Sequence, residues 1–169
     1  MRRRKPEPGA AAEADQRTVQ TAAYALLAGR DFSRHELTER LLRKGYGAAV
    51  VEAAVAAVVQ EGFLREERFA EQFVTQRAGR GQGPLRVRMG LRDRGVESET
   101  IDQALDTTEA DWVQAAREAR RRKFGLSPPA DYRERAKQAR FLQYRGFSSD
   151  QIRAALGPGP ADDDGDPDL

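Results

Sequence analysis

Arginine is the residue type with the clearest chemical potential in this sequence. The chain holds 29 Arg and Lys residues, and arginine outnumbers lysine by 25 to 4. A guanidinium group presents its N–H donors in a planar fork that matches carboxylates and phosphates. We therefore predict an anionic partner, either a nucleic acid or an acidic protein surface, although solvated helix faces have a similar composition. The candidate contact residues are Arg86, Arg88, Arg92, Arg94, Arg117, Arg120, Arg121, Lys123, Arg133, Lys137 and Arg140.

The charge is nearly balanced overall, at +2, but it is unevenly distributed along the chain. Residues 65–94 hold eight Arg against four acidic residues, and residues 111–145 hold ten Arg and Lys against four. Between them, residues 95–110 hold five acidic residues and no basic one. This alternation predicts distinct charged faces rather than a uniformly basic surface.

Other kinds of site have little support in the sequence. The chain has no Cys, which excludes disulfides and thiolate chemistry, and its single histidine, His35, cannot build a histidine metal site. The acidic pair Glu66–Glu67 stands where a helix is expected to start, where carboxylates stabilise the helix dipole. The glycine-rich GRGQGP lacks the Lys-Ser/Thr that a phosphate-binding loop requires. We expect a protein with no catalytic residues, no metal and no cofactor.

Length and composition indicate a small helical protein. The 169 residues suit one domain or a few repeated units, and 39% of them are hydrophobic but only 7% aromatic. No apolar run is long enough to cross a membrane, and the basic first residues are not followed by the apolar stretch of a secretory signal. We expect a cytoplasmic monomer that has no contact with membranes.

Three glycines mark an internal repeat. Gly45, Gly95 and Gly146 lie 50 and 51 residues apart, each with a basic residue before it, an apolar residue after it and a leucine four positions earlier. Glycine adopts the left-handed conformation that ends a helix, and the leucine and the later apolar residue are the two positions that touch in a Schellman ending. The pattern predicts the same helix stop three times.

Further helices complete each repeat. Val51, Ile101 and Ile152 follow the three glycines by six residues, and a second apolar residue comes four positions later on the same helical face. We predict an all-α fold, an elongated array of three tandem three-helix repeats. The predicted segments are a disordered basic tail at 1–16, repeats at 17–64, 65–108 and 109–157, and a disordered acidic tail at 158–169.

The order of short motifs resembles the RecX family of regulatory proteins. They include Y-A-L-L, D-F-S, L-x-x-K-G-Y, G-x-L-x-x-x-R-F-A, G-P, L-x-x-R-G-V and R-G-F, spread over about residues 18–157. The third repeat is the loosest match, with Gln138 where the earlier repeats have the apolar Leu37 and Val87. Proteins of this family consist of three tandem three-helix repeats, in agreement with the pattern above.

The resemblance implies a function in recombination, DNA repair and the SOS response. RecX-like proteins bind filaments of the RecA recombinase on single-stranded DNA, lie in the filament groove, and inhibit ATP hydrolysis and strand exchange. The resemblance thus implies a RecA filament as partner, with single-stranded DNA contacted through it. Two alternatives remain: a helical-repeat protein that binds DNA by itself, and a helical scaffold unrelated to recombination.

Overall fold

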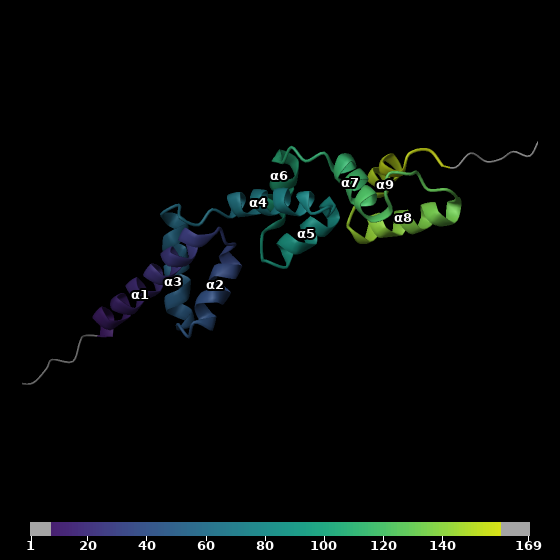
Figure 1. Ribbon diagram of the computed structural model, residues 1–169. Coiled ribbons are helices and arrows are strands. Elements are labelled where there is room, and N and C mark those ends of the chain that lie inside the picture. The colour runs from purple at the N-terminus through teal and green to yellow at the C-terminus, as the bar shows by residue number, and fades with distance from the viewer. Residues whose placement is uncertain (1–7, 160–169) are drawn as a thin grey trace, which may run out of the picture. The chain divides into compact units, whose positions relative to one another are not determined.

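A computed structural model of the protein describes residues 8–159, and in this part of the chain all regular structure is helical (Figure 1). Within residues 8–159, nine α-helices follow one another in three groups of three, as the sequence predicts. The helices are α1 (Pro8–Gly29), α2 (Arg34–Arg43), α3 (Ala48–Gln60), α4 (Glu66–Gly79), α5 (Pro84–Arg92), α6 (Ser98–Thr107), α7 (Trp112–Phe124), α8 (Tyr132–Tyr144) and α9 (Ser149–Leu156).

Helix α1 begins earlier than the sequence analysis expects. The structure places residues 8–16 in the helix, whereas the sequence analysis assigns them to a disordered tail. The alanines of this segment have the highest intrinsic helix propensity, and the helix begins at Pro8, where proline needs no N–H partner. The rest of the predicted basic tail, residues 1–7, and residues 160–169 of the predicted acidic tail lie outside the described residues.

The three predicted helix stops are confirmed. Gly45, Gly95 and Gly146 have φ values of +92°, +71° and +91°. After Gly95 the amide of Val96 donates to the Leu91 carbonyl at 3.1 Å, and after Gly146 the next amide donates to the Leu142 carbonyl at 3.2 Å. These bonds close Schellman endings and satisfy carbonyls that the helices leave free. We call the segments 44–46, 94–96 and 145–147 the helix-stop turns.

Serine side chains cap the N-termini of two helices. The Ser33 side chain accepts from the amide of Glu36, and Ser148 forms a reciprocal capping box with Gln151. The Glu36 carboxylate pairs instead with Arg30 at 3.0 Å and with Arg94 at 3.1 Å. Side chains therefore satisfy free backbone amides at the N-termini of α2 and α9. These caps determine the residue at which each preceding loop ends.

The chain divides into two compact units. Unit 1 holds the residues up to Gln72 together with Leu91–Ala104, and unit 2 holds Phe73–Gly90 together with the residues from Leu105 onwards. This division cuts across the middle three helices, so the bounds of the three predicted segments stay a prediction. The elongated arrangement of the array also stays a prediction.

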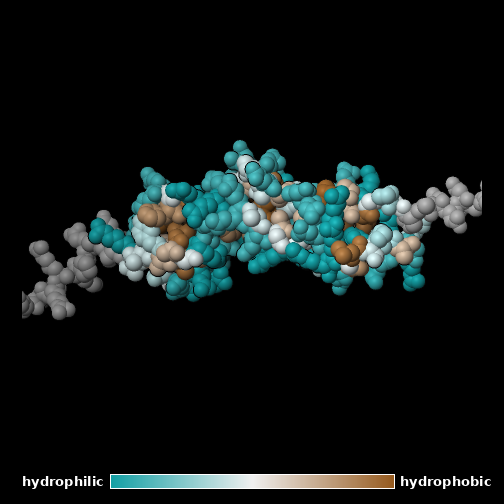
Figure 2. Space-filling model, turned by 45° about the horizontal axis from the view of Figure 1, so that its top comes forward, coloured by the Kyte–Doolittle hydropathy of each residue, from teal (hydrophilic) through white to brown (hydrophobic). Residues whose placement is uncertain are grey.

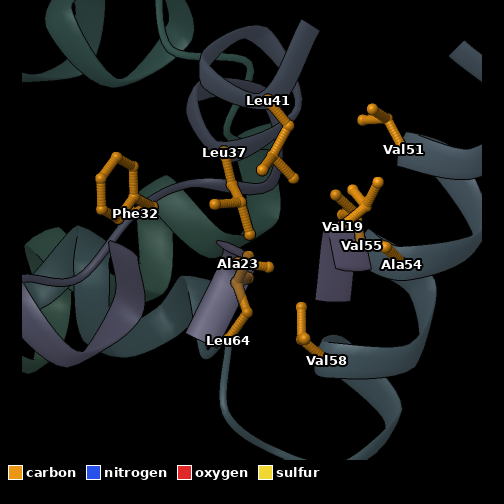
Figure 3. Close-up of a cluster of buried hydrophobic side chains, with 10 residues drawn as sticks. All are labelled: Val19, Ala23, Phe32, Leu37, Leu41, Val51, Ala54, Val55, Val58 and Leu64. Atoms are coloured by element: carbon orange, nitrogen blue, oxygen red, sulfur yellow. The ribbon is translucent and has the colours of Figure 1, made fainter. Parts of the chain in front are cut away.

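Unit 1 has a core of aliphatic side chains between its first three helices. Helix α3 packs against α1 and α2, and its valines meet leucines of α2 and small residues of α1 (Figure 3). The close packing leaves these side chains at most a few per cent exposed, and this burial stabilises the short helices α2 and α3, which would be marginal alone. The core residues are Val19, Ala23, Phe32, Leu37, Leu41, Val51, Ala54, Val55, Val58 and Leu64.

Unit 2 has a smaller core between α7, α8 and α9. Helix α7 packs against α9 through the small residues Ala116 and Ala119, and Leu142, Phe147 and Leu156 fill the space beside them. Alanines bring the helix backbones close together, so a core with few large side chains still excludes water. The bulky residues of this unit that remain exposed are therefore not needed to build its core.

The glycine-rich loop between α4 and α5 makes close contacts with another turn. Gly81 and Gly83 are buried, and the Gly83 amide donates to the Arg145 carbonyl at 2.8 Å. A Cβ at Gly83 would lie 2.3 Å from the Gly146 carbonyl oxygen. Glycine is needed here because the chain passes directly against another turn, and this contact positions the N-terminus of α5.

Candidate nucleic-acid interface

The two compact units carry opposite net charges. Among the described residues, unit 2 holds fifteen Arg and Lys against seven Asp and Glu, whereas unit 1 holds ten against fourteen. The stretch Phe73–Gly90 of unit 2 contains four arginines and no acidic residue. A local excess of positive charge raises the concentration of a polyanion at the surface, so unit 2 is the better candidate for a phosphate-binding surface.

The predicted arginines of α5 and its helix-stop turn have different environments. Arg86 and Arg92 are exposed, and Arg88 is half-buried. Arg94 is also half-buried, and its Nε lies 3.1 Å from the Glu36 carboxylate. In addition, the Ser33 hydroxyl donates to the Arg94 carbonyl at 2.7 Å. Arg94 therefore anchors the turn after α5 to the start of α2, and it is less available to a phosphate than the other three.

Helix α7 divides its basic residues between the surface and the interior. Arg117, Arg121 and Lys123 are exposed, but Arg120 is only 6% exposed. The Arg120 Nε donates to the Gln138 side chain at 2.8 Å, and its Nη2 donates to the Ser127 carbonyl. In this arrangement the Arg120 guanidinium is buried and already bonded to internal acceptors, so its contact with a partner stays a prediction.

The same contact explains why Gln138 differs from the corresponding residues of the first two repeats. Gln138 is 1% exposed and occupies the position that corresponds to the apolar Leu37 and Val87. Its amide oxygen accepts from Arg120, and its amide nitrogen donates to Glu134 at 3.4 Å. A polar residue is required here since a buried charge without an acceptor is costly.

Helix α8 presents its three predicted basic residues to solvent. Arg133, Lys137 and Arg140 are all exposed, and Arg133 and Lys137 are four residues apart on one helical face. Arg135, on the same helix, is used internally: its guanidinium donates to the carbonyls of Leu156, Gly157 and Pro158 beyond the end of α9. The open basic surface of α8 is thus made by the residues that the sequence singled out.

The helix-stop turns also connect helices that are distant in the sequence. A Cβ at Gly146 would lie 2.4 Å from Arg86 Cβ, and one at Gly95 would lie 2.7 Å from His35 Cβ, whereas Gly45 has open space. In unit 2, the Leu85 amide donates to the Gly146 carbonyl at 3.0 Å. Gly95 and Gly146 therefore have two roles. Each ends a helix, and each also leaves room for the start of an earlier helix to pack directly against the turn.

Three exposed arginines of unit 2, Arg80, Arg122 and Arg153, are not among the candidates of the sequence analysis. Arg80 lies in the loop between α4 and α5, and its carbonyl accepts from Arg145 at 3.0 Å. It belongs to the acid-free stretch Phe73–Gly90, and that absence of acidic residues is the signal that would have identified it. The exposed basic surface of unit 2, as used below, comprises Arg80, Arg86, Arg117, Arg121, Arg122, Lys123, Arg133, Lys137, Arg140 and Arg153.

Other kinds of site have no support in the described part of the chain. No group of three or more His, Asp or Glu side chains between residues 8 and 159 is placed to hold a metal ion. Within the same residues, no helix has the length and hydrophobicity needed to cross a membrane. Hydrophilic residues cover most of the face drawn in Figure 2, and hydrophobic residues form small separate patches on it. On this face, hydrophilic residues dominate and no large apolar patch is drawn.

The fold matches solved structures. A crystal structure of the regulatory protein RecX is 20% identical, with a TM-score of 0.73, and the match covers 89% of this chain and 79% of that one. RecX from Lactobacillus salivarius is also 20% identical, with a TM-score of 0.68 and coverage of 83% and 93%.

Sequence comparisons give the same family at higher identity. The regulatory protein RecX of Halorhodospira halophila is 47% identical over 161 residues, which is 95% of this chain and 98% of that protein. A Pseudomonas fluorescens protein of the same name is 44% identical over 145 residues, 86% and 94% of the two chains. Models of the first, second and third three-helix domains of RecX match residues 21–56, 66–105 and 109–156. Because these matches span most of the chain in the family's domain order, the chain belongs to the RecX family of regulatory proteins.

Proposed function

We propose that this protein is a negative regulator of the RecA recombinase. In this proposal it binds RecA filaments on single-stranded DNA and inhibits ATP hydrolysis and strand exchange. The observation that carries the proposal is membership of the RecX family over nearly the whole chain, with 47% identity to a curated regulatory protein. Recombination and DNA repair are the processes in which such a regulator acts.

The separation of charge supports a particular mode of binding. Unit 2 carries the excess of basic residues and unit 1 the excess of acidic ones. The exposed basic surface of unit 2 would contact DNA phosphates in the filament. Many modest contacts to repeated subunits give avidity only when those subunits are assembled, so this mode favours filaments over free RecA. Charge complementarity would mainly speed encounter and set register.

A pair of charge reversals on α8 tests the proposal. We expect Arg133→Glu/Lys137→Glu to weaken inhibition of RecA ATP hydrolysis by about tenfold or more, because phosphate contacts are replaced by repulsion. Both side chains are exposed, and a glutamate in the first turn of α8 suits the helix dipole, so the fold should be unaffected. The matched control is Arg40→Glu/Arg43→Glu, which makes the same change of charge on exposed residues of α2 in unit 1.

Three outcomes separate the proposal from its alternatives. Loss of inhibition in the unit 2 variant but not in the unit 1 variant supports the proposal. Tight, steeply salt-dependent binding to bare DNA with no effect of the wild-type protein on RecA hydrolysis would favour a stand-alone DNA-binding protein. No binding either to bare or to RecA-coated DNA would favour a scaffold unrelated to recombination.

The arginines of α5 give a second, weaker test. Reversing Arg88 and Arg92 to Glu is expected to weaken inhibition while the helical signal and melting temperature stay near those of the wild type. Arg88 is half-buried and engaged in an interaction of its own, so part of any loss could come from the fold. The α8 variant is therefore the sharper experiment.

A further inference from the structure

Tyr144, the last residue of α8, has an aromatic ring that the fold does not use in its core. Its side chain is 73% exposed, whereas Leu142 and Phe147 on either side are buried in the core of unit 2. A large aromatic residue left in solvent next to a well-packed core is available to a ligand.

The guanidinium of Arg86 lies against this ring. Arg86 Cζ is 5.1 Å from the centroid of the Tyr144 ring, and its Nη1 donates to the Tyr144 carbonyl at 3.1 Å. The cation–π contact and the hydrogen bond hold the two groups together, with further N–H donors of the guanidinium left for a ligand. The pair therefore combines a planar apolar face with a fixed positive charge.

The backbone beneath the pair is tightly fastened. The amides of Gly83 and Leu85 donate to the carbonyls of Arg145 and Gly146, at 2.8 and 3.0 Å. Since no side chain separates Gly146 from Arg86, the start of α5 and the turn after α8 are in direct contact. Arg86 and Tyr144, which are 58 residues apart in the sequence, are thus positioned before any ligand arrives, which lowers the entropy cost of binding.

The surroundings of the pair favour a polyanion. The stretch Phe73–Gly90, which contains Arg86, has no acidic residue, and Arg145 follows Tyr144 directly. Leu85 and Met89 of α5 are 53% and 63% exposed, so apolar area is also available on this helix. Positive charge combined with exposed aromatic and apolar groups is typical of surfaces that bind single-stranded nucleic acids.

We propose that Tyr144 and Arg86 form a binding site for an unpaired nucleobase and its neighbouring phosphate. The base stacks on the open face of the tyrosine ring, and the guanidinium contacts the phosphate. A base-paired duplex would bind less well, because its bases are already stacked on one another. This inference deepens the proposed function, on which it rests for the role of single-stranded DNA, by adding direct contact with a base.

The test compares two oligonucleotides that differ only in their bases. Binding of the full chain to a fluorescently labelled oligothymidylate, and to an abasic oligonucleotide of equal length, is measured by anisotropy without RecA. Both ligands carry the same phosphates, so their difference in affinity isolates base contacts. We expect the wild type to prefer the base-bearing strand by about tenfold, the size typical of one stacked base.

Single substitutions assign this preference to the ring. Tyr144→Ala should remove the preference, leaving affinity for the abasic strand and the salt dependence nearly unchanged, and Tyr144→Phe should retain it. The matched control is Tyr132→Ala, since Tyr132 is another exposed tyrosine of α8, at 58%. The melting temperature of each variant is measured to check that its fold is intact.

The inference and the proposed function can fail separately. Equal binding of the wild type to both strands, or no binding to either at low salt, would overturn the base site, as would an equal loss of preference in the Tyr144→Ala and Tyr132→Ala variants. RecA ATP hydrolysis is measured independently with the wild-type protein. If the base preference depends on Tyr144 but the protein leaves RecA hydrolysis unchanged, the base site stands and the proposed regulatory role is wrong.

Discussion

The buried pair Arg120–Gln138 gives the most discriminating prediction about this fold. Arg120 is 6% exposed, and its Nε has the Gln138 amide oxygen as acceptor at 2.8 Å. Gln138→Leu places in repeat 3 the kind of residue that repeats 1 and 2 have at this position. If hydrophobicity alone decided stability, replacing a buried amide by leucine would stabilise the protein. We expect it to destabilise the protein instead.

The expected size follows from the contacts of the guanidinium. The substitution removes a hydrogen bond to a charged group and leaves a buried N–H without an acceptor, which costs about 2–3 kcal/mol. The bond from Arg120 Nη2 to the Ser127 carbonyl remains, so the charge keeps one internal partner. Apolar burial of leucine offsets part of the loss, and we expect a net decrease of about 2 kcal/mol in the free energy of unfolding.

Replacing both residues should restore stability. In Arg120→Met/Gln138→Leu neither a charge nor an amide is left without a partner, and the free energy of unfolding should be within about 1 kcal/mol of wild type, or higher. Arg120→Met alone leaves the Gln138 amide oxygen without its donor and should cost about 1–2 kcal/mol. The two single losses therefore should not add in the double variant.

Urea unfolding followed by circular dichroism at 222 nm measures all four proteins. A double variant whose loss equals the sum of the single losses would refute the idea that Gln138 is present to satisfy Arg120. The same variants test whether Arg120 belongs to the predicted interface. Arg120→Met should leave affinity for single-stranded DNA unchanged, while Arg121→Met, which removes the neighbouring exposed charge, should weaken it.

Two further predictions follow from other contacts. Gly146→Ala should lower the free energy of unfolding by at least about 1 kcal/mol more than Gly45→Ala, because both have positive φ but only at Gly146 would the new Cβ meet another helix; thermal unfolding measures the difference. The hydrogen bond to the Glu61 carboxylate raises the pKa of Tyr24 above its ordinary value, so Glu61→Gln should lower that pKa in a spectrophotometric titration. The stabilisation from this bond is present below the ordinary pKa of tyrosine and should be lost as the pH rises through the raised value; an unchanged Tyr24 pKa in Glu61→Gln would contradict the assignment.

The sequence by itself determined the helices and where they end. Gly45, Gly95 and Gly146 end helices because left-handed backbone is strained for other residues, and Ser33 and Ser148 begin helices because their hydroxyls satisfy free amides. These are local requirements, which depend on neighbours within a few positions and can therefore be recognised from residue types and spacing. The family could be recognised for the same reason, since its motifs are these local signals in a fixed order.

Only the tertiary structure decided which basic residues are available to a partner. Arg120 and Arg121 are adjacent in the sequence, yet one is buried against Gln138 and the other is exposed. Arg86 meets Tyr144 across 58 residues because two glycines allow the backbones to touch. Burial and contact between distant segments depend on how helices pack, and helix packing depends on many side chains at once, so spacing along the chain cannot reveal it.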